Sequence, residues 1–348
     1  MARALVWTLA AGLLAAGCGM PTVPRDRVTF AILGGAYYSA AAGPQVDGAL
    51  VEESGAILAK AVADLNAARD LDFVIITGDL LAQADGLSLD RAKAILSELR
   101  VPYYAVLGAH DGPAAPVAQY GLVRAGAGGA APAAPCGMSR DMVVWALQGH
   151  GFAGPERYWH REVLPGLVVV GLDTVQPGRA AGHVSAAQLA WLDQTLASQP
   201  DKAAIVVAYH ELVPMHPLDE GAAWCHKMVD NAAEVRQVLE RHTNVLAVLA
   251  GNSHFAEGRV LGRIMYLSSP SLAIWPLAYH LVRMTPKEAE AVWVPVAADD
   301  VLRRGQERLL RSAEYRGVFP PGEDGDTACV RLFGGKKMET YSLPAIRP

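Results

Sequence analysis

The chain has 348 residues, of which 52% are hydrophobic and 19% are charged, and this apolar content suffices for one large α/β domain or two smaller ones. The formal net charge is −5 at pH 7 and the sequence pI is about 6.1. Because binding to a nucleic-acid backbone needs a basic face, this charge argues against a nucleic-acid partner. Beyond residue 20, no apolar stretch approaches the roughly 18 residues that a membrane-spanning helix needs.

Residues 1–17 have the pattern of a cleaved signal peptide. A basic start at Arg3 precedes the apolar run 4–17, which has the usual length of a signal's hydrophobic region. The run ends in Leu14-Ala-Ala-Gly-Cys18, which resembles the lipobox of bacterial lipoproteins, although Ala15 stands where the commonest pattern has Leu. The resemblance implies cleavage before Cys18 and a lipid on its sulfur, so that the mature protein is anchored to a membrane without crossing it. The alternative is an ordinary cleaved signal followed by an incidental cysteine.

The same resemblance implies an exported lipoprotein that faces the periplasm or the cell exterior. The residue after the cysteine is Gly19 and not Asp. In bacterial lipoproteins this choice favours the outer membrane, if the cell has one. Residues 18–26 are expected to be a tether. Three further cysteines, at 136, 225 and 329, leave at least one unpaired and indicate no particular pairing, and no two have the spacing of zinc ligands.

From residue 27 onward, hydrophobic periodicity predicts strands that alternate with helices, and this alternation favours an α/β sheet with helices on its outer faces. Ser88, with Asp90 in the first turn, is the expected start of the second helix. Residues 112–140 are rich in Gly, Ala and Pro and are expected to form a surface excursion. The strands are expected at 28–33, 73–77, 103–107, 167–172, 204–208 and 245–250, and the helices at 50–65, 88–99, 185–197 and 231–241.

The last third of the chain has strand patterns with no helices between them. These patterns predict a second sheet packed on the first, followed by a charged helix over 298–316 and a terminal hairpin over 327–342 that turns at Gly334-Gly335. The expected organisation is therefore a signal (1–17), a tether (18–26), a main domain (27–296) and a C-terminal helix and hairpin packed on it (297–348). The strand patterns lie at 259–261, 264–268, 280–284 and 291–294.

Five short motifs follow predicted strands, at the sheet edge where α/β proteins collect binding residues. The motifs read Gly35-Ala-Tyr37, Gly78-Asp79, Gly108-Ala-His110-Asp111, Tyr209-His210 and Gly251-Asn-Ser-His254. Their order resembles that of the calcineurin-like metallophosphoesterases, which carry Asp-x-His, Gly-Asp, Gly-Asn-His-Asp/Glu, a lone His and Gly-His-x-His. Segments 168–174 and 188–192 resemble the cyclic-nucleotide-phosphodiesterase-like branch, and the similarity runs from about residue 28 to 294.

This resemblance implies a four-layer α/β/β/α sandwich with a two-metal phosphoesterase site. Two cations roughly 3.5–4 Å apart would clamp a phosphate and activate a water. The resemblance implies that Asp79 is the carboxylate shared by both metals, that His254 binds the first metal and that His210 binds the second. It also implies that His110 is a general acid beside the leaving group, oriented by Asp111.

The departures from the family pattern fall on the metal ligands. Gly35 and Tyr37 replace the first Asp and His, Ala109 replaces the Asn, and Asn252 replaces the first His of the last motif. Residues that only support ligands are worth about 10–100-fold in metal affinity, so losing two ligands per site predicts a loss of at least about 10²–10⁴-fold. The alternative is a weak or single-metal site, with a Tyr37 phenolate on Fe(III) or the Asn252 carbonyl as replacement ligands.

The leading hypothesis is a degenerate family member, which would be a binding or structural lipoprotein of the envelope with little or no hydrolase activity. Its divalent metal (Mn, Fe or Zn) would be weakly bound or absent. The alternative is an active phosphomonoesterase or phosphodiesterase with a reduced or rebuilt metal site. A third possibility, metal-free hydrolysis through His110 and His210, has no nucleophile motif to support it. The sequence leaves open whether the partner is a small phosphoester or a protein.

Overall fold

The structure is a computed structural model, and it describes residues 27–41, 45–113, 137–177, 179–216, 219, 224–315, 319, 324–330, 333 and 338–343. The expected signal and tether, most of the 112–140 excursion and the Gly334-Gly335 turn lie outside these residues. Within them, no helix has the length and apolar character needed to cross a membrane.

The first sheet combines the beginning and the end of the chain. Its order is β12-β11-β10-β1-β2-β3, with β1, β2 and β3 parallel to one another and the other three strands antiparallel to their neighbours. The parallel strands are runs of β-branched and aromatic residues buried on both faces, as helix-covered sheets require. The bounds are β1 Val28–Leu33, β2 Phe73–Ile76, β3 Tyr103–Ala105, β10 Ala278–Met284, β11 Glu288–Pro295 and β12 Met338–Ser342.

The second sheet comes from the middle of the chain. Its order is β4-β5-β6-β7-β9-β8, with a parallel centre and one antiparallel strand at each edge. The bounds are β4 Trp159–Leu164, β5 Leu167–Gly171, β6 Ala203–Val207, β7 Val245–Ala250, β8 Gly258–Leu261 and β9 Ile264–Ser268.

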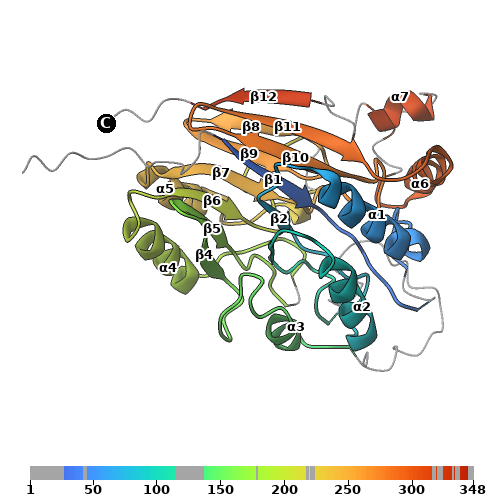
Figure 1. The fold of residues 1–348 in the computed structure, drawn as a ribbon, viewed down its shortest axis with the longest axis horizontal. Coiled ribbons are helices and arrows are strands. Elements are labelled where there is room, and N and C mark those ends of the chain that lie inside the picture. Colours follow the sequence, from blue (N-terminus) through green and yellow to red (C-terminus); the bar gives the residue numbers. More distant parts are fainter. Residues whose placement is uncertain are drawn as a thin grey trace, which may run out of the picture.

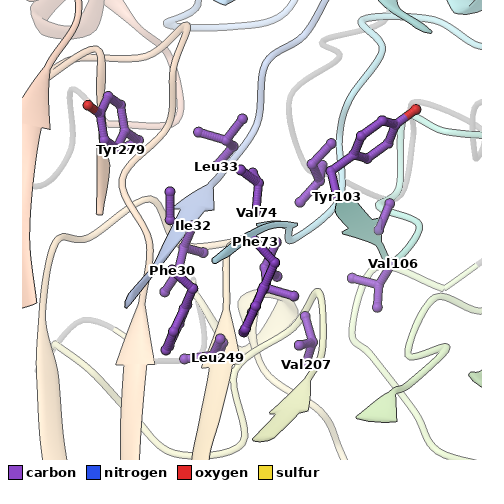
Figure 2. Packing of buried hydrophobic residues seen from close by; sticks show 14 of the residues in the cluster. Phe30, Ile32, Leu33, Phe73, Val74, Tyr103, Val106, Val207, Leu249 and Tyr279 are labelled. Atoms are coloured by element: carbon purple, nitrogen blue, oxygen red, sulfur yellow. The ribbon is translucent and has the colours of Figure 1, made fainter. Parts of the chain in front are cut away.

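The two sheets pack face to face and the helices lie outside them. Phe30 and Phe73 stack with their ring centroids 5.2 Å apart and point from the first sheet toward Val207 and Leu249 of the second (Figure 2). Helices α1 and α2 lie beside the first sheet, and α4 and α5 lie beside the second (Figure 1). This confirms the expected α/β/β/α sandwich. The bounds are α1 Ser54–Ala67, α2 Gly86–Leu96, α4 Ala186–Ala197 and α5 Ala232–Arg241.

Helix α2 begins earlier than the sequence pattern indicates. Its N-cap is Asp85, whose carboxylate accepts a hydrogen bond from the amide of Ser88 at 2.8 Å. Ser88 therefore lies in the first turn, where it is buried and its hydroxyl accepts from the amide of Ala40. The prediction of Ser88 as the helix start is wrong, because Asp85 is the residue with the extended backbone that a cap requires.

The later strands are shared between the two sheets. Strands β8 and β9 extend the second sheet, whereas β10 and β11 complete the first, so the expectation that these strands alone form a separate sheet is wrong. The expected 327–342 hairpin is also wrong: residues 325–329 form helix α7 (Gly325–Cys329), and β12 pairs with β11 from Glu288↔Ser342 onward. The sequence-distant strand β11 provides β12 with the pairing that a local hairpin would have supplied.

Helices α3 and α6 and two short 3-10 helices complete the described chain. Helix α6 (Asp299–Arg311) is shorter than the expected 298–316, and α3 (Arg140–Ala146) and β4 are additions that the periodicity did not indicate. Two short 3-10 helices, η1 (Val51–Glu53) and η4 (Cys225–Lys227), precede α1 and α5.

Candidate metal centre

The five motifs meet where parallel strands of the two sheets end. Gly35, Asp79, His110, His210 and His254 follow β1, β2, β3, β6 and β7 respectively. Parallel strands direct these loops to one edge of each sheet, as expected for an α/β binding site.

Three residues of this region have a left-handed backbone. Tyr37, Asp79 and His254 have φ angles of 44°, 50° and 63°. Such conformations are uncommon for residues other than glycine, and they tend to cluster at functional sites. The loops thus keep a strained, site-like backbone.

The carboxylate of Asp79 is fully buried and accepts three hydrogen bonds. The hydroxyls of Tyr37 and Tyr209 donate to Oδ2 at 2.9 and 2.6 Å, and the amide of His110 donates to Oδ1 at 2.8 Å. Burial alone would raise the pKa of Asp79, but His110 and these hydrogen bonds outweigh it and hold the pKa below its usual value. Asp79 is thus an anion whose lone pairs are directed at protein donors.

The phenol of Tyr37 also contacts the second predicted ligand, His254. Its oxygen lies 3.2 Å from Nε2 of His254, and burial raises the pKa of Tyr37 well above 10. Because the phenol's single hydrogen goes to Asp79, the hydrogen of the second contact must come from Nε2 of His254. A Tyr37 phenolate on Fe(III) would have to give up the hydrogen bond that the phenol donates to Asp79.

The other ring nitrogen of His254 is also engaged. Nδ1 lies 3.1 Å from the hydroxyl of Tyr315, which follows helix α6. Burial lowers the pKa of His254 to about 3, so the ring is neutral and Nδ1 accepts from Tyr315. A chain of hydrogen bonds therefore runs from Tyr315 through His254 and Tyr37 to Asp79.

Position 35 has no room for the carboxylate that the family pattern places there. A Cβ added to Gly35 would lie 2.7 Å from Cε2 of Tyr37 and 3.3 Å from Nε2 of His254. The ring of Tyr37 fills the space that an Asp side chain would enter. The two substitutions in the first motif are therefore spatially linked.

His210 is buried but its hydrogen bonds run away from Asp79. Nδ1 lies 2.8 Å from the hydroxyl of Thr174, which also accepts the His210 amide, and Nε2 lies 3.3 Å from the carbonyl of Ala180. Burial lowers the pKa of His210 to about 3. Among the described residues no hydrogen bond joins His210 to Asp79, and both of its ring nitrogens are occupied.

His110 lies at the site, and Asp111 has a different role from the one expected. Nδ1 of His110 lies 2.9 Å from the carbonyl of Ala82, and its ring meets the ring of Tyr37 edge-on at 5.2 Å. The Asp111 carboxylate instead accepts the amides of Gly108 and Leu81 at 2.9 and 3.0 Å. Burial, with the nearby Asp79 charge, raises the pKa of Asp111 to about 6. Asp111 thus ties together the loops after β2 and β3.

Ala109 offers no side-chain donor, and Asn252 is directed elsewhere. The side-chain amide of Asn252 donates to the carbonyl of Lys227 at 3.4 Å, and Lys227 forms an ion pair with Glu314 at 2.8 Å. Throughout the described ranges, no group of three or more His, Cys, Asp and Glu side chains is arranged to hold a metal ion. The donor set does not fit a two-metal centre.

Sequence reasoning missed several residues of this network. Tyr209 directly precedes a predicted ligand, so its position in the motif was the available signal. Thr174 lies in the segment of family resemblance without belonging to a ligand motif. Tyr315 and Glu314 lie about 60 residues beyond the last motif, and no local pattern connects them to it.

No protein-family model matches the chain. It is 26% identical over 210 residues to a probable cyclic nucleotide phosphodiesterase of Synechococcus sp., covering 59% of this chain and 67% of the relative. It is 24% identical over 186 residues to the 3',5'-cyclic adenosine monophosphate phosphodiesterase of Escherichia coli, covering 53% of this chain and 55% of the relative. The aligned region thus spans between about half and two thirds of these relatives.

Among solved structures, a dimetal phosphatase from Danio rerio has a TM-score of 0.58 with 16% identity, covering 78% of this chain and 96% of the phosphatase. This likeness concerns the fold, and it agrees with the two mixed sheets described above. The sequence relatives and the shared fold both agree with the resemblance of the motifs to the calcineurin-like metallophosphoesterases.

Proposed function

We propose that this protein is a degenerate metallophosphoesterase that serves as a binding or structural protein of the cell envelope, with little or no phosphoesterase activity. The observation that carries the proposal is the position of the Tyr37 phenol between Asp79 and His254. These are two of the ligands that a metal would need, and both are already engaged: Asp79 accepts three hydrogen bonds, and both ring nitrogens of His254 have partners.

Displacing the Tyr37 phenol would add an energetic cost to the loss of ligands. A metal bound between Asp79 and His254 would displace the phenol of Tyr37, which is 3% exposed. A buried polar group left without partners costs about 1–3 kcal/mol. This cost comes on top of a site that has already lost a carboxylate at position 35 and an amide at position 109.

The proposal includes a lipid anchor at Cys18 on an exported protein, in the outer membrane where the cell has one. The lipobox-like Leu14–Cys18 segment supports it. The partners would then be the membrane, through the lipid, and a protein or small phosphoester recognised outside the former metal site. The net charge of −5 disfavours nucleic acid.

The deciding experiment uses the soluble Cys18→Ser chain, purified after growth with Mn, Fe or Zn. We expect well below one metal per chain, and hydrolysis of bis(p-nitrophenyl) phosphate and 3',5'-cyclic AMP no faster than with the matched Asp79→Ala variant. Close to two tightly held metals per chain, together with turnover that Asp79→Ala abolishes, would establish the active phosphoesterase instead.

A further inference from the structure

The segment after α6 is directed into the protein at the former metal site. Arg304 and Arg308 pair with Glu53 and Glu52 of η1, which holds α6 against the start of α1. Just beyond the helix, Asp47 accepts the hydroxyl of Ser312 at 2.6 Å and the amide of Glu314 at 2.9 Å. These contacts fix the turn that buries Tyr315 completely.

Tyr315 makes the first connection to the site. Its hydroxyl lies 3.1 Å from Nδ1 of His254, and the other nitrogen of that ring contacts Tyr37. Its ring packs against Trp224 and Phe333, with centroids 5.4 and 5.0 Å apart. Tyr37 belongs to the same buried cluster. Tyr37, which replaces a metal ligand, is thus joined to Tyr315 through His254.

Glu314 makes the second connection. Its carboxylate forms an ion pair with Lys227 at 2.8 Å, and the carbonyl of Lys227 accepts the side-chain amide of Asn252. Burial alone would raise the pKa of Glu314, but the Lys227 charge holds it well below its usual range. Asn252 is another substituted ligand position. Two consecutive residues therefore reach two substituted positions, each through one intermediary.

From this pair of connections we infer that residues 309–315, together with Phe333, form an intramolecular plug of the former metal site. Tyr315 and Glu314 link the loops after β1, β2 and β7 through hydrogen bonds and an ion pair, where metals would otherwise link them. Leu309 and Phe333 complete the apolar side of the plug in the cluster that contains Tyr37. The inference rests on the proposed function, because a metal would compete for Asp79 and His254. It implies that a binding partner is recognised on another surface.

A double-mutant cycle on the full Cys18→Ser chain tests the plug. Tyr37→Phe and Tyr315→Phe each remove one hydroxyl from His254. In urea the first should raise the unfolding equilibrium constant about 30-fold, because Asp79 also loses a donor, and the second about fivefold. Because both act through one imidazole, the double variant should change the constant by clearly less than the product of the single effects.

Tyr341→Phe is the matched control, because the Tyr341 hydroxyl bonds to Glu339 of its own strand. In the double variant with Tyr37→Phe, the change in the unfolding equilibrium constant should equal the product of the two single changes. A second readout is hydrogen exchange of the Tyr37 amide, which donates to the Asp79 carbonyl at 3.0 Å. That amide should exchange several-fold faster in Tyr315→Phe and be unchanged in Tyr341→Phe.

Independent effects of Tyr37→Phe and Tyr315→Phe, with unchanged exchange at Tyr37, would overturn the plug. None of these measurements involves metal or phosphoester. A metal-loaded, hydrolytic parent that still shows the coupling would refute only the proposed function. An inactive parent without the coupling would refute only the plug.

Discussion

Tyr37 and Asp79 are joined twice, once through their side chains and once through their backbones. The phenol donates to the carboxylate at 2.9 Å, and the Tyr37 amide donates to the Asp79 carbonyl at 3.0 Å. Both residues have a left-handed backbone. The loops after β1 and β2 are thereby held together at the point where a shared metal ligand is expected, and the protein supplies this link from its own side chains.

The first prediction concerns this link. Tyr37→Phe should lower the free energy of unfolding by about 2 kcal/mol, because Asp79 loses a donor and His254 loses an acceptor in a buried site. Urea unfolding at pH 7.5 measures it. Tyr38→Phe is the control, since this neighbouring tyrosine makes no hydroxyl hydrogen bond within the described residues, and it should change stability by less than half as much. Equal effects would show that the Tyr37 hydroxyl contributes nothing specific.

The second prediction concerns the buried ion pair of Lys227 and Glu314. Lys227→Met should lower the free energy of unfolding by about 3–5 kcal/mol, because Glu314 would remain largely buried without its lysine partner, with His226 3.7 Å from its carboxylate. Adding Glu314→Gln to that variant should recover part of the loss in the same urea assay. No recovery in the double variant would mean that Lys227 acts through its packing on Trp224, 5.9 Å from the ring centroid.

The third prediction is a pH dependence that originates inside the sandwich. His280 is 2% exposed, its Nδ1 has no hydrogen-bond partner within the described residues, and burial lowers its pKa from 6.5 to about 3. A depressed pKa means that the unfolded chain binds more protons below pH 6.5. Stability is therefore complete above pH 6.5 and is lost as the pH falls toward 3, by about 1.4 kcal/mol per unit for this group.

His280→Leu should remove this contribution. At pH 7.5 the free energy of unfolding of the variant should lie within about 1 kcal/mol of the parent's. Below pH 6.5 the variant should become steadily more stable relative to the parent, and urea midpoints measured between pH 4.5 and 7.5 would show this. His210 and His254, whose pKa values are also about 3, keep part of the acid dependence in both proteins. Parallel curves over the whole range would contradict the assignment of His280 as a neutral buried histidine.

Strand positions and motif order could be predicted from the sequence because both are local. The apolar runs Val28–Leu33 and Val245–Ala250 are buried over their whole length and have the expected bounds. Asp79 and His254 follow strands, as expected. In such runs burial alone selects the strand, so the pattern contains the required information.

Side-chain directions and distant partners could not be predicted in this way. Whether His210 faces Asp79 or Thr174 depends on packing around Gly182, where an added Cβ would lie 2.6 Å from the His210 ring. Tyr315 reaches His254 across 61 positions in the sequence, and no periodicity encodes that contact. The hairpin prediction failed for the same reason, since β12 pairs with a distant strand.

The fourth prediction concerns the anchor. Cys18 should incorporate labelled fatty acid in a bacterial host, and Cys18→Ser should release the protein into the soluble envelope fraction, because a single lipidated cysteine would be the attachment. Cys329→Ser is the matched control and should leave membrane attachment unchanged, since Cys329 is buried in the folded protein. Membrane attachment that persists in Cys18→Ser would exclude the lipid anchor.

The fifth prediction is that metal binding can be restored only when Tyr37 is removed. Gly35→Asp alone should destabilise the protein, because the new Cβ would lie 2.7 Å from the Tyr37 ring. The double variant Gly35→Asp, Tyr37→His should lose less stability than the sum of the losses of the two single variants. Backbone conformation is no obstacle, since Gly35 is not among the glycines with positive φ, and His tolerates the left-handed backbone at position 37 better than most side chains.

The complete variant adds Ala109→Asn and Asn252→His, which restores each expected ligand type. Mn²⁺ at about 100 times its dissociation constant should then stabilise the protein by about 2.7 kcal/mol, and bis(p-nitrophenyl) phosphate should be hydrolysed faster than by the parent. The same variant with Tyr37 retained is the control and should gain neither property. A folded complete variant that binds no Mn²⁺ would show that the ligand losses are not the only barrier. The hydrogen bonds that hold His210 on Thr174 and Ala180 would then be the next contacts to change.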